Sequence, residues 1–199
     1  MNSSKGTRRA EAGKLRIIGG KYRSRQLRVA ARPGLRPTPD RVRETLFNWL
    51  GQWLDGFACL DLFAGTGALG FEAASRGAAR VVMVENDAKV FKALRQFRDV
   101  IGARQVELVP GDAFDYLKKA KDQFDLVFLD PPFRQNALPA VMERLPARLA
   151  PRARVYVEAP SPIEPQAGWR ELKRSRAGQV SFQLLQWGSD DQGGLPRNV

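Results

Sequence analysis

The stretch ACLDLFAGTGALG, residues 58–70, decides the fold. Its first half is an apolar run of strand length, and its second half places Gly65, Gly67 and Gly70 before a small and apolar segment that Gly77 closes. Glycines between a buried strand and a helix let the backbone approach a ligand, but they also let the strand and the helix pack closely. With either role, the stretch predicts the first strand, turn and helix of an open parallel sheet.

The same alternation continues toward the C-terminus. Apolar segments of strand length alternate with amphipathic segments, in which residues such as Val90, Leu94 and Phe97 repeat at the spacing of one helix face. This pattern predicts an α/β fold with a mostly parallel, Rossmann-like sheet that helices cover on both faces. We predict strands over residues 58–65, 80–87, 105–112, 124–130 and 153–160, and helices over residues 66–77, 88–102, 113–120 and 137–150.

Residues 169–188, WRELKRSRAGQVSFQLLQWG, depart from this alternation. Two extended stretches flank a turn signal at Ala177-Gly178 and leave no room for a crossover helix. We therefore expect a C-terminal antiparallel hairpin at one side of the sheet. Residues 189–199 are predicted to be a loose tail.

The positive charge of the chain is concentrated at its N-terminal end. The net charge is +12, and residues 1–44 hold 13 Lys and Arg against 3 Asp and Glu. Residues 1–13 are predicted to be a disordered basic tail, whereas residues 14–29 alternate basic and apolar residues around Gly19-Gly20, as in a β-hairpin. A basic hairpin is a surface that meets phosphates. We predict contacts with nucleic acid from Arg16, Lys21, Arg23, Arg25, Arg28 and Arg41.

A helix over residues 39–50 is predicted to link the hairpin to the sheet. Thr38 can cap its N-terminus, Pro39 suits its first position, and Asp40 lies near the positive end of the helix dipole. We therefore divide the chain into four parts. These are a tail (1–13), a basic hairpin with its linking helix (14–50), the core domain (51–188) and a second tail (189–199).

The rarest residue types exclude several chemistries. The chain contains no histidine and a single cysteine, Cys59. Structural disulfides, zinc sites and Ser-His or Cys-His nucleophiles are therefore not expected, and we predict no metal. Cys59 lies inside the first predicted strand, where we expect a packed thiol. No segment has the length and apolarity of a membrane span, and the first residues lack the core of a signal peptide, so we expect a cytoplasmic protein without a membrane partner.

Acidic residues end the first four predicted strands: Asp61, Glu85, Asp112 and Asp130. In open parallel sheets, ligands bind beyond these carboxyl ends, where the order of the strands reverses. A dinucleotide would bring negative phosphates to a ring of acids, whereas S-adenosylmethionine brings a sulfonium and an ammonium group and no phosphate. The acids therefore favour S-adenosylmethionine.

We assign each acid near the glycines a part of this cofactor. Asp61 is predicted to lie near the methionine part, Glu85 to accept from both ribose hydroxyls, and Asp112 to accept from the adenine amine. The alternative is that the acids are solvated loop residues and that the glycines serve packing alone. The predicted cofactor site comprises Asp61, Phe63, Gly65, Gly67, Glu85, Asn86, Asp112 and Ala113.

The segment FDLVFLDPPF, residues 124–133, ends the fourth strand with the predicted catalytic residues. An exocyclic amine of a nucleobase is a poor nucleophile because its lone pair is delocalised into the ring. The Asp130 carboxylate and the Pro131 carbonyl can accept both amine hydrogens, while Pro131 and Pro132 fix the backbone and Phe133 can stack on the base. The alternative is a proline-rich turn that only ends the strand.

These motifs resemble a known group. LDLFAGTGALG, VEND, GDAF and DPPF are similar to the class I S-adenosylmethionine-dependent methyltransferases that act on amino groups. RIIGGKYRSRQL, GLRPTPDRVRETLFNWL and DLFAGTGALGFEAASRGA narrow the resemblance, over about residues 14–187, to the bacterial family that methylates guanine N2 in 16S ribosomal RNA. The resemblance implies cofactor contacts for Gly65, Gly67, Glu85 and Asp112, a base held by residues 130–133, and the small ribosomal subunit as partner.

Three other functions stay open at this point. One is an adenine-N6 methyltransferase acting on DNA or on another RNA, although guanine presents two donors, N1–H and N2–H, to a carboxylate where adenine N1 is an acceptor. Another is an NAD-dependent oxidoreductase, which the glycine pattern also fits. The last is an RNA-binding module without catalytic activity.

Overall fold

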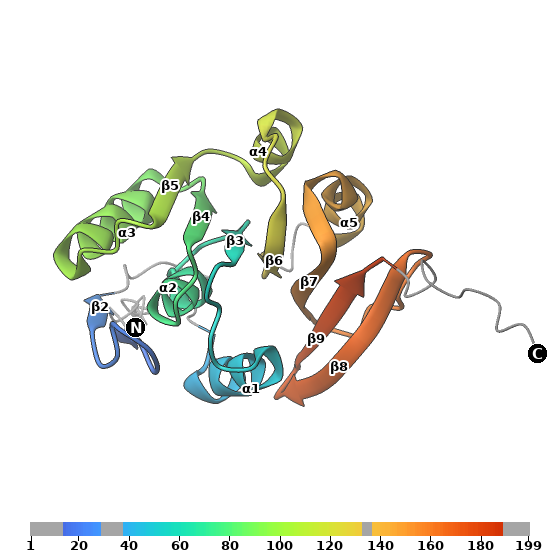
Figure 1. The fold of residues 1–199 in the computed structure, drawn as a ribbon, viewed down its shortest axis with the longest axis horizontal. Helices are drawn as coiled ribbons and strands as arrows, with labels where there is room; N and C mark the ends of the chain where they lie inside the picture. Colours follow the sequence, from blue (N-terminus) through green and yellow to red (C-terminus); the bar gives the residue numbers. More distant parts are fainter. Residues whose placement is uncertain (1–13, 29–37, 133–136, 189–199) are drawn as a thin grey trace, which may run out of the picture.

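The computed structural model describes residues 14–28, 38–132 and 137–188, with a seven-stranded sheet at its centre (Figure 1). The strands lie in the order β5-β4-β3-β6-β7-β9-β8. Pairing is parallel from β5 to β7 and antiparallel for β9 and β8, which confirms the predicted sheet and its C-terminal hairpin. The bounds are β3 Ala58–Asp61, β4 Arg80–Glu85, β5 Val106–Pro110, β6 Phe124–Leu129, β7 Leu149–Ala159, β8 Trp169–Ala177 and β9 Val180–Trp187.

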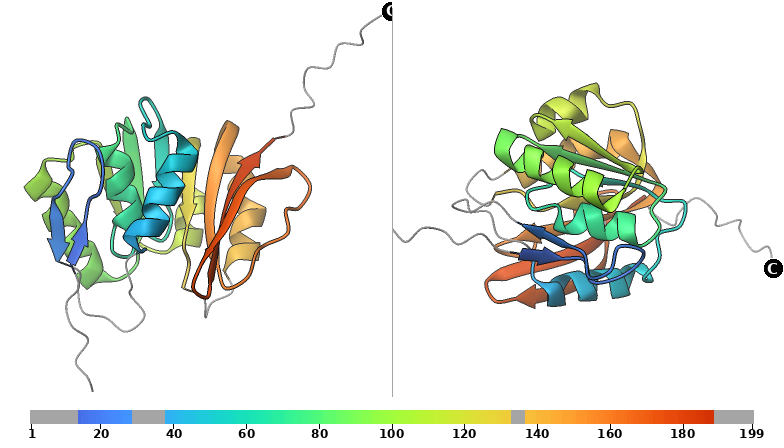
Figure 2. Two further views of the ribbon diagram at one scale, coloured as in Figure 1. Left: turned by 90° about the horizontal axis from the view of Figure 1, so that it is seen from below. Right: turned by 90° about the vertical axis from the view of Figure 1, so that its left-hand side faces the viewer.

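Helices cover both faces of this sheet (Figure 2). Alternate residues of β4 show the two faces: Val81 and Met83 belong to one buried apolar cluster, and Val82 and Val84 to another. The first cluster contains residues of α1, α2 and α3, and the second contains residues of α4 and α5. The helices are α1 Asp40–Leu50, α2 Ala68–Ser75, α3 Ala88–Ile101, α4 Ala113–Lys119 and α5 Leu138–Arg144, followed by the 3₁₀-helix η2 Leu145–Arg148.

The order of the strands reverses beside β3. From β3 the chain continues outward to β4 and β5, and then returns to form β6 on the other side of β3. The edge between the ends of β3 and β6 is therefore the switch point at which open α/β sheets bind ligands. Asp61 ends β3 and Asp130 directly follows β6, so two of the predicted site residues flank this point.

The N-terminal hairpin is present as a second, two-stranded sheet. β1 (Lys14–Arg16) pairs antiparallel with β2 (Gln26–Arg28), with Leu15 opposite Leu27. This pairing centres the hairpin on residue 21, so the prediction that the strands are arranged around Gly19-Gly20 is off by one to two residues. We call residues 14–28 the arm; it lies beside α2 in Figure 1.

Two predicted elements differ from the structure in ways that proline explains. The helix predicted over 137–150 ends as an α-helix at Arg144 and continues as a 3₁₀-helix that contains Pro146, because proline lacks the N–H group that an α-helix interior needs. As a result, β7 starts at Leu149, four residues before the predicted strand. At α1 the N-cap is Pro39, without a side-chain capping bond, so the capping role predicted for Thr38 is wrong.

Cys59 is fully buried within β3, and burial, with the charges of Asp125 and Asp61, raises the pKa of its thiol. The prediction of a packed thiol is confirmed. Among residues 14–28, 38–132 and 137–188, no helix combines the length and the apolarity needed to cross a membrane. The two predicted tails, 1–13 and 189–199, lie outside the described residues.

Candidate active site

Two acids fix the glycine turn between β3 and α2. Asp61 Oδ2 accepts a hydrogen bond from the Gly70 N–H at 2.9 Å, and Glu85 Oε2 accepts one from the Gly65 N–H at 2.9 Å. Gly65 and Gly67 both have positive φ, +51° and +78°, a conformation that residues with side chains rarely adopt. The turn is therefore held in shape by the ends of β3 and β4, the strands on either side of it.

Packing explains two of the three glycines. A Cβ atom on Gly67 would lie 2.7 Å from Leu94 and Phe71, and one on Gly70 would lie 2.7 Å from the Met83 sulfur. A side chain at Gly70 would collide with β4 and one at Gly67 with residues of α2 and α3, so close packing accounts for glycine at both positions. Gly65, whose N–H donates to Glu85, has a positive φ in the turn like that of Gly67.

Glu85 is placed at the end of β4, as predicted, and is half-buried. Its Oε1 accepts from the Asp87 N–H at 2.7 Å, and the Asn86 backbone is a further donor to the carboxylate. The two oxygens together have about four acceptor sites, so three backbone donors leave capacity for a ligand hydroxyl. Burial is the main cause of a raised Glu85 pKa, and these backbone donors oppose it. Asn86 follows Glu85 and is exposed.

Asp112 is exposed and caps the N-terminus of α4. Its Oδ1 accepts from the backbone N–H groups of Phe114, at 2.7 Å, and of Asp115, at 3.3 Å. This local function is enough to explain an aspartate at the position, whatever else it binds. Ala113, the first residue of α4, is buried.

The three remaining acids form a group at the switch point. The pKa of Asp61 is raised to about 7, mainly by burial and also by the neighbouring charge of Glu85, while the backbone N–H groups of Gly70 and Phe63 oppose the shift. The pKa of Asp130 lies well above its usual range because of burial first, and then because of the negative charges of Glu158 and Asp61. The structure thus brings Asp61, Glu85 and Asp130 together, and Asp112 is not among the groups that act on them.

Pro131 is buried and Pro132 is exposed directly after Asp130. Neither residue has an N–H group, so no donor of these two residues competes with a ligand for the Asp130 carboxylate. Phe133, the predicted stacking residue, lies outside the described residues. Phe63, in the glycine turn, is half-buried and packs against the apolar cluster of the α4 and α5 face.

Glu158 is an acid of this site that the sequence interpretation missed. It is the second-to-last residue of β7, which ends at Ala159. Its carboxylate accepts a hydrogen bond from the Tyr156 hydroxyl at 2.8 Å, and the Thr38 side chain also hydrogen-bonds to it. The signal was present in the sequence, because Glu158 follows an apolar strand just as the other four acids do.

The basic residues predicted to bind nucleic acid lie on the arm and on α1. Arg16, Lys21, Arg23, Arg25 and Arg41 are exposed, while Arg28 is placed by its backbone at the end of β2, opposite Lys14. Arg16 also forms an ion pair with Asp40 at 3.5 Å, so part of its charge is compensated within the protein. The arm therefore presents several exposed cations on one short hairpin.

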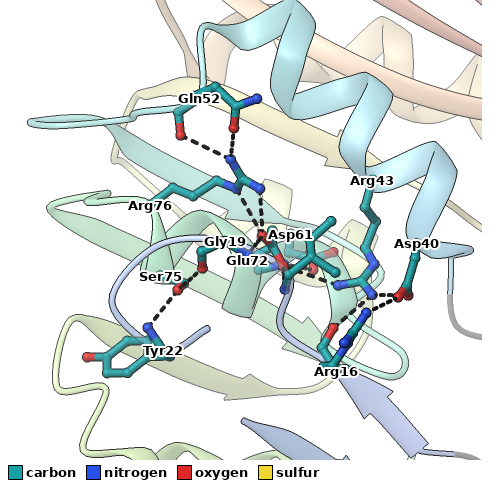
Figure 3. Close-up of polar contacts among 12 residues, drawn as sticks. Arg16, Gly19, Tyr22, Asp40, Arg43, Gln52, Asp61, Glu72, Ser75 and Arg76 are labelled. Atoms are coloured by element: carbon teal, nitrogen blue, oxygen red, sulfur yellow. Dashed lines mark hydrogen bonds and ion pairs between the residues drawn. The ribbon is translucent and has the colours of Figure 1, made fainter. Parts of the chain in front are cut away.

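A buried ionic cluster fastens this arm to α2 (Figure 3). The Glu72 carboxylate accepts from the N–H groups of Ile18, at 2.9 Å, and Gly19, at 2.8 Å, and pairs with Arg43 at 3.2 Å and Arg76 at 2.9 Å. We call Glu72, Arg43 and Arg76 the Glu72 cluster. A buried carboxylate needs such partners, since an unpaired charge in the interior is strongly unfavourable.

The arm also contacts the last turn of α2 through its backbone. The Ser75 carbonyl accepts from the Lys21 N–H at 2.7 Å, and the Ser75 hydroxyl oxygen accepts from the Tyr22 N–H at 2.8 Å. Gly20 has φ of +73°, and a Cβ atom there would lie 1.8 Å from the Ser75 carbonyl oxygen. The glycine pair therefore allows the arm to approach α2, which explains why it is not at the centre of the hairpin.

The family model of "conserved hypothetical protein 95" matches residues 15–186. "Ribosomal RNA small subunit methyltransferase D" of Haemophilus influenzae is 42% identical over 182 residues, covering 87% of this chain and 94% of the relative. The protein of the same name from Escherichia coli is 42% identical over 181 residues, covering 88% and 91%.

Solved structures agree with these sequence matches. The structure of an Escherichia coli protein that is 41% identical has a TM-score of 0.81 and is covered over its whole length by 89% of this chain. A Haemophilus influenzae structure, 38% identical, has a TM-score of 0.77. The chain is similar to ribosomal RNA small subunit methyltransferase D over most of its length. It therefore belongs to the conserved hypothetical protein 95 family and is a class I methyltransferase.

Proposed function

We propose that this enzyme transfers a methyl group from S-adenosylmethionine to the exocyclic N2 of a guanine in 16S ribosomal RNA of the small subunit. The observation that carries the proposal is the position of Asp130 and Pro131. They follow β6 at the switch point, beside the glycine turn that Asp61 and Glu85 hold. The names of the relatives, with identities of 42% over most of the chain, support a substrate in the small ribosomal subunit.

The donor groups at the ends of β3 and β4 fit S-adenosylmethionine. Glu85 retains acceptor capacity for a ribose hydroxyl, and Asp112, just after β5, can accept from the adenine amine through the oxygen that does not cap α4. Asp61, when ionised, places negative charge where a cationic group of the cofactor would be bound. When bound, the cofactor supplies a methyl group that is already activated by the positive sulfur.

The residues after β6 are suited to hold an amine. The Asp130 carboxylate and the Pro131 carbonyl accept the two hydrogens of guanine N2, which turns the nitrogen lone pair out of the ring plane and toward the methyl group. The nitrogen gains the methyl group and loses a proton, for which Asp130 is the acceptor. Alignment supplies most of the rate, and proton transfer supplies the rest.

The arm supplies affinity for RNA. Its exposed arginines and lysine are suited to phosphate contacts, which give affinity without choosing a sequence. The target base has to leave its stack to reach Asp130, which favours a loop nucleotide in folded RNA. A ribosomal substrate also implies a cytoplasmic enzyme.

The test is transfer of labelled methyl from S-adenosylmethionine to small ribosomal subunits that lack the modification. The RNA is then digested and the methylated nucleoside is identified. We expect label in N2-methylguanosine at a single position, and no label with the Asp130→Ala variant.

Other outcomes separate the alternatives. Label in N6-methyladenosine would select the adenine enzyme. Tight binding of NAD without binding of S-adenosylmethionine in calorimetry would select the oxidoreductase. A wild-type enzyme that binds the cofactor and the subunits but transfers no methyl would contradict the proposed reaction.

A further inference from the structure

Asp130 and Glu158 lie side by side on neighbouring parallel strands. Leu129 of β6 pairs with Val157 of β7, and one residue earlier Phe128 pairs with Tyr156, with ring centroids 6.4 Å apart. Successive side chains of a strand point to opposite faces. Asp130 and Glu158, two residues beyond the Phe128–Tyr156 pair, therefore extend from the same face of the sheet, the face that α1 covers.

Glu158 is held by donors from two parts of the chain. Its side chain is 6% exposed and receives the Tyr156 hydroxyl at 2.8 Å, while Thr38, just before α1, also hydrogen-bonds to it. Tyr156 is itself fully buried, with its ring 6.3 Å from that of Phe182, so its hydroxyl has little freedom to turn away. Burial raises the pKa of Glu158, and both contacts oppose that rise and fix the position of the carboxylate.

The two strands beside β6 each contribute a negative charge near Asp130. Asp61 acts from β3 and Glu158 from β7, while Tyr156 is a hydroxyl donor and not a cation. Among the described residues, no Lys or Arg forms an ion pair with Asp130 or Glu158. Two adjacent carboxylates without a cation hold a proton more strongly than either would alone.

We propose that Glu158, fixed by Tyr156 and Thr38, is a positioning residue that orients Asp130 and makes it a better acceptor for the amine proton; this rests on the proposed function. In the reaction, the N2–C bond forms while the C–S bond breaks and leaves its electron pair on sulfur. The N2 proton passes to the Asp130 carboxylate, and Glu158 stabilises the protonated Asp130 as its neighbour. The step consumes no other reactant.

Thr38 links the Glu158 carboxylate to the segment before α1. Because Thr38 does not cap α1, its hydroxyl is available to Glu158. The residue lies on the chain between the RNA-binding arm and the catalytic strand ends. The segment that precedes α1 is thus connected by one hydrogen bond to the carboxylate beside Asp130.

The test that does not depend on the substrate is a titration of side-chain carboxyl ¹³C signals in the cofactor-free protein. We compare wild type with Glu158→Gln, which keeps the size of the side chain and removes its charge, and with Glu143→Gln, which alters an exposed glutamate on α5. Asp130 is expected to titrate at lower pH in Glu158→Gln and at the wild-type pH in Glu143→Gln. An identical Asp130 titration in wild type and Glu158→Gln would overturn the inference.

The rate of methyl transfer gives the second readout. Glu158→Gln is expected to lower kcat by about tenfold or more at alkaline pH, to leave KM for RNA and for S-adenosylmethionine unchanged, and to move the acid limb of the pH profile to lower pH. The deficit therefore narrows toward acid pH, which a purely structural role would not produce. Tyr156→Phe is expected to lower kcat less, with Tyr116→Phe on α4 as its matched control.

The two proposals fail in different ways. If the wild-type enzyme does not methylate the small subunit, the proposed function is wrong, while the Asp130 titration still decides the role of Glu158. If the wild type is active and Glu158→Gln shows the same profile and the same Asp130 titration, only the positioning role is wrong. Wild-type spectra and cofactor affinity in each variant establish that its fold is intact.

Discussion

At the scale of single residues, the carboxylates of this site differ in what their surroundings do to them. Asp112 is exposed and engaged by the N-terminus of α4, whereas Asp61 is buried, Asp130 is half-buried, and both carry raised pKa values. Strongly perturbed titratable groups concentrate at functional sites. The difference separates the acids that we propose to act on a ligand from the one that caps a helix.

Asp61 predicts how cofactor affinity depends on pH. Its pKa is about 7 in the free protein, so part of the population is neutral at physiological pH. A bound cation favours the ionised form and thus lowers this pKa, so binding releases a proton and becomes tighter as pH rises from 6 to 8. Isothermal titration calorimetry over this range, in buffers of different ionisation enthalpy, measures both effects.

The Asp61→Asn variant is the control for that prediction. It should bind the cofactor more weakly at pH 8, and the dependence on pH should largely disappear. Affinity of the wild type that is independent of pH, with no proton release, would show that Asp61 does not face the cation.

Asp130 predicts a loss of rate without a loss of binding. Asp130→Asn keeps the shape of the side chain but replaces one acceptor with a donor, which opposes the amine and removes the proton acceptor. We expect single-turnover methyl transfer to slow by a factor of about 10² to 10⁴, the usual range for a group of this kind. S-adenosylmethionine affinity should change little, and Glu143→Gln should behave as wild type in both measurements. A variant with the wild-type rate would remove Asp130 from the chemistry.

At the scale of elements, the sequence predicts what is local and misses what depends on contacts between distant residues. The apolar runs of β3, β4 and β6 and the amphipathic pattern of α3 define these elements by themselves. Thr38 has the composition of a helix cap, yet its hydroxyl binds Glu158, 120 positions further along the chain. Gly19-Gly20 has the composition of a turn, yet it serves the contact with Ser75 of α2. Neither partner is visible from the local sequence.

In the candidate site, too, the sequence predicts local features and misses those that depend on contacts between distant residues. The rule that acids at strand ends surround a ligand predicted a group that includes Asp61, Glu85 and Asp130, and the structure brings these three together because the ends of parallel strands meet at one edge. Glu72 could not be found by that rule, since it lies inside α2, and its one local signal is a charge in an otherwise apolar helix. Arg76 is a local partner four residues further along, but the other partners come from the arm and from α1, so only the fold reveals those.

The Glu72 cluster predicts that α2 and the arm are stabilised together. Glu72→Gln leaves the buried Arg43 without its buried ionised partner and replaces one of the two oxygens that accept from the arm N–H groups with an NH₂ donor. We expect the free energy of unfolding to fall by about 3 kcal/mol or more, as when one member of a buried ion pair is removed. Urea denaturation followed by circular dichroism measures this change.

The matched control is Glu107→Gln, which breaks a surface ion pair with Arg80. Exposed pairs contribute less than about 1 kcal/mol, so its unfolding midpoint should stay near that of the wild type. Equal losses in the two variants would mean that the Glu72 cluster is no more important than a surface pair.

At the scale of the whole molecule, the acidic residues of the proposed site and the exposed basic residues of the arm lie in different parts of the structure. The acids lie at the carboxyl ends of the sheet, and the exposed cations of the arm lie beside α2, the helix that follows the glycine turn (Figure 2). The net charge of +12 is therefore not a general property of the surface. An anionic macromolecule is attracted to the arm, while the acidic strand ends remain suited to a cationic cofactor and to an amine.

This separation predicts that RNA affinity can be altered without altering the cofactor site. Lys21→Glu, Arg23→Glu and Arg25→Glu together change three exposed residues of the arm that do not belong to the Glu72 cluster. Each phosphate contact contributes about 0.7 to 0.9 to the slope of log affinity against log salt, so losing three contacts should flatten the slope by about 2 to 3. We expect weaker binding of 16S ribosomal RNA and an unchanged affinity for S-adenosylmethionine. Filter binding between about 50 and 300 mM salt measures the first, over a range that includes a Debye length of roughly 10 Å, and calorimetry measures the second.

A second triple variant tests whether position or net charge matters. Lys118→Glu, Lys119→Glu and Lys121→Glu make the same change in net charge at three exposed lysines at and just beyond the end of α4, on the opposite face of the sheet from α2. If the arm binds the phosphates, this variant loses some long-range attraction but keeps the wild-type salt slope, because no phosphate contact is removed. Equal flattening of the slope in both variants would show that RNA responds to the overall charge of the protein, and the arm would lose its assigned role.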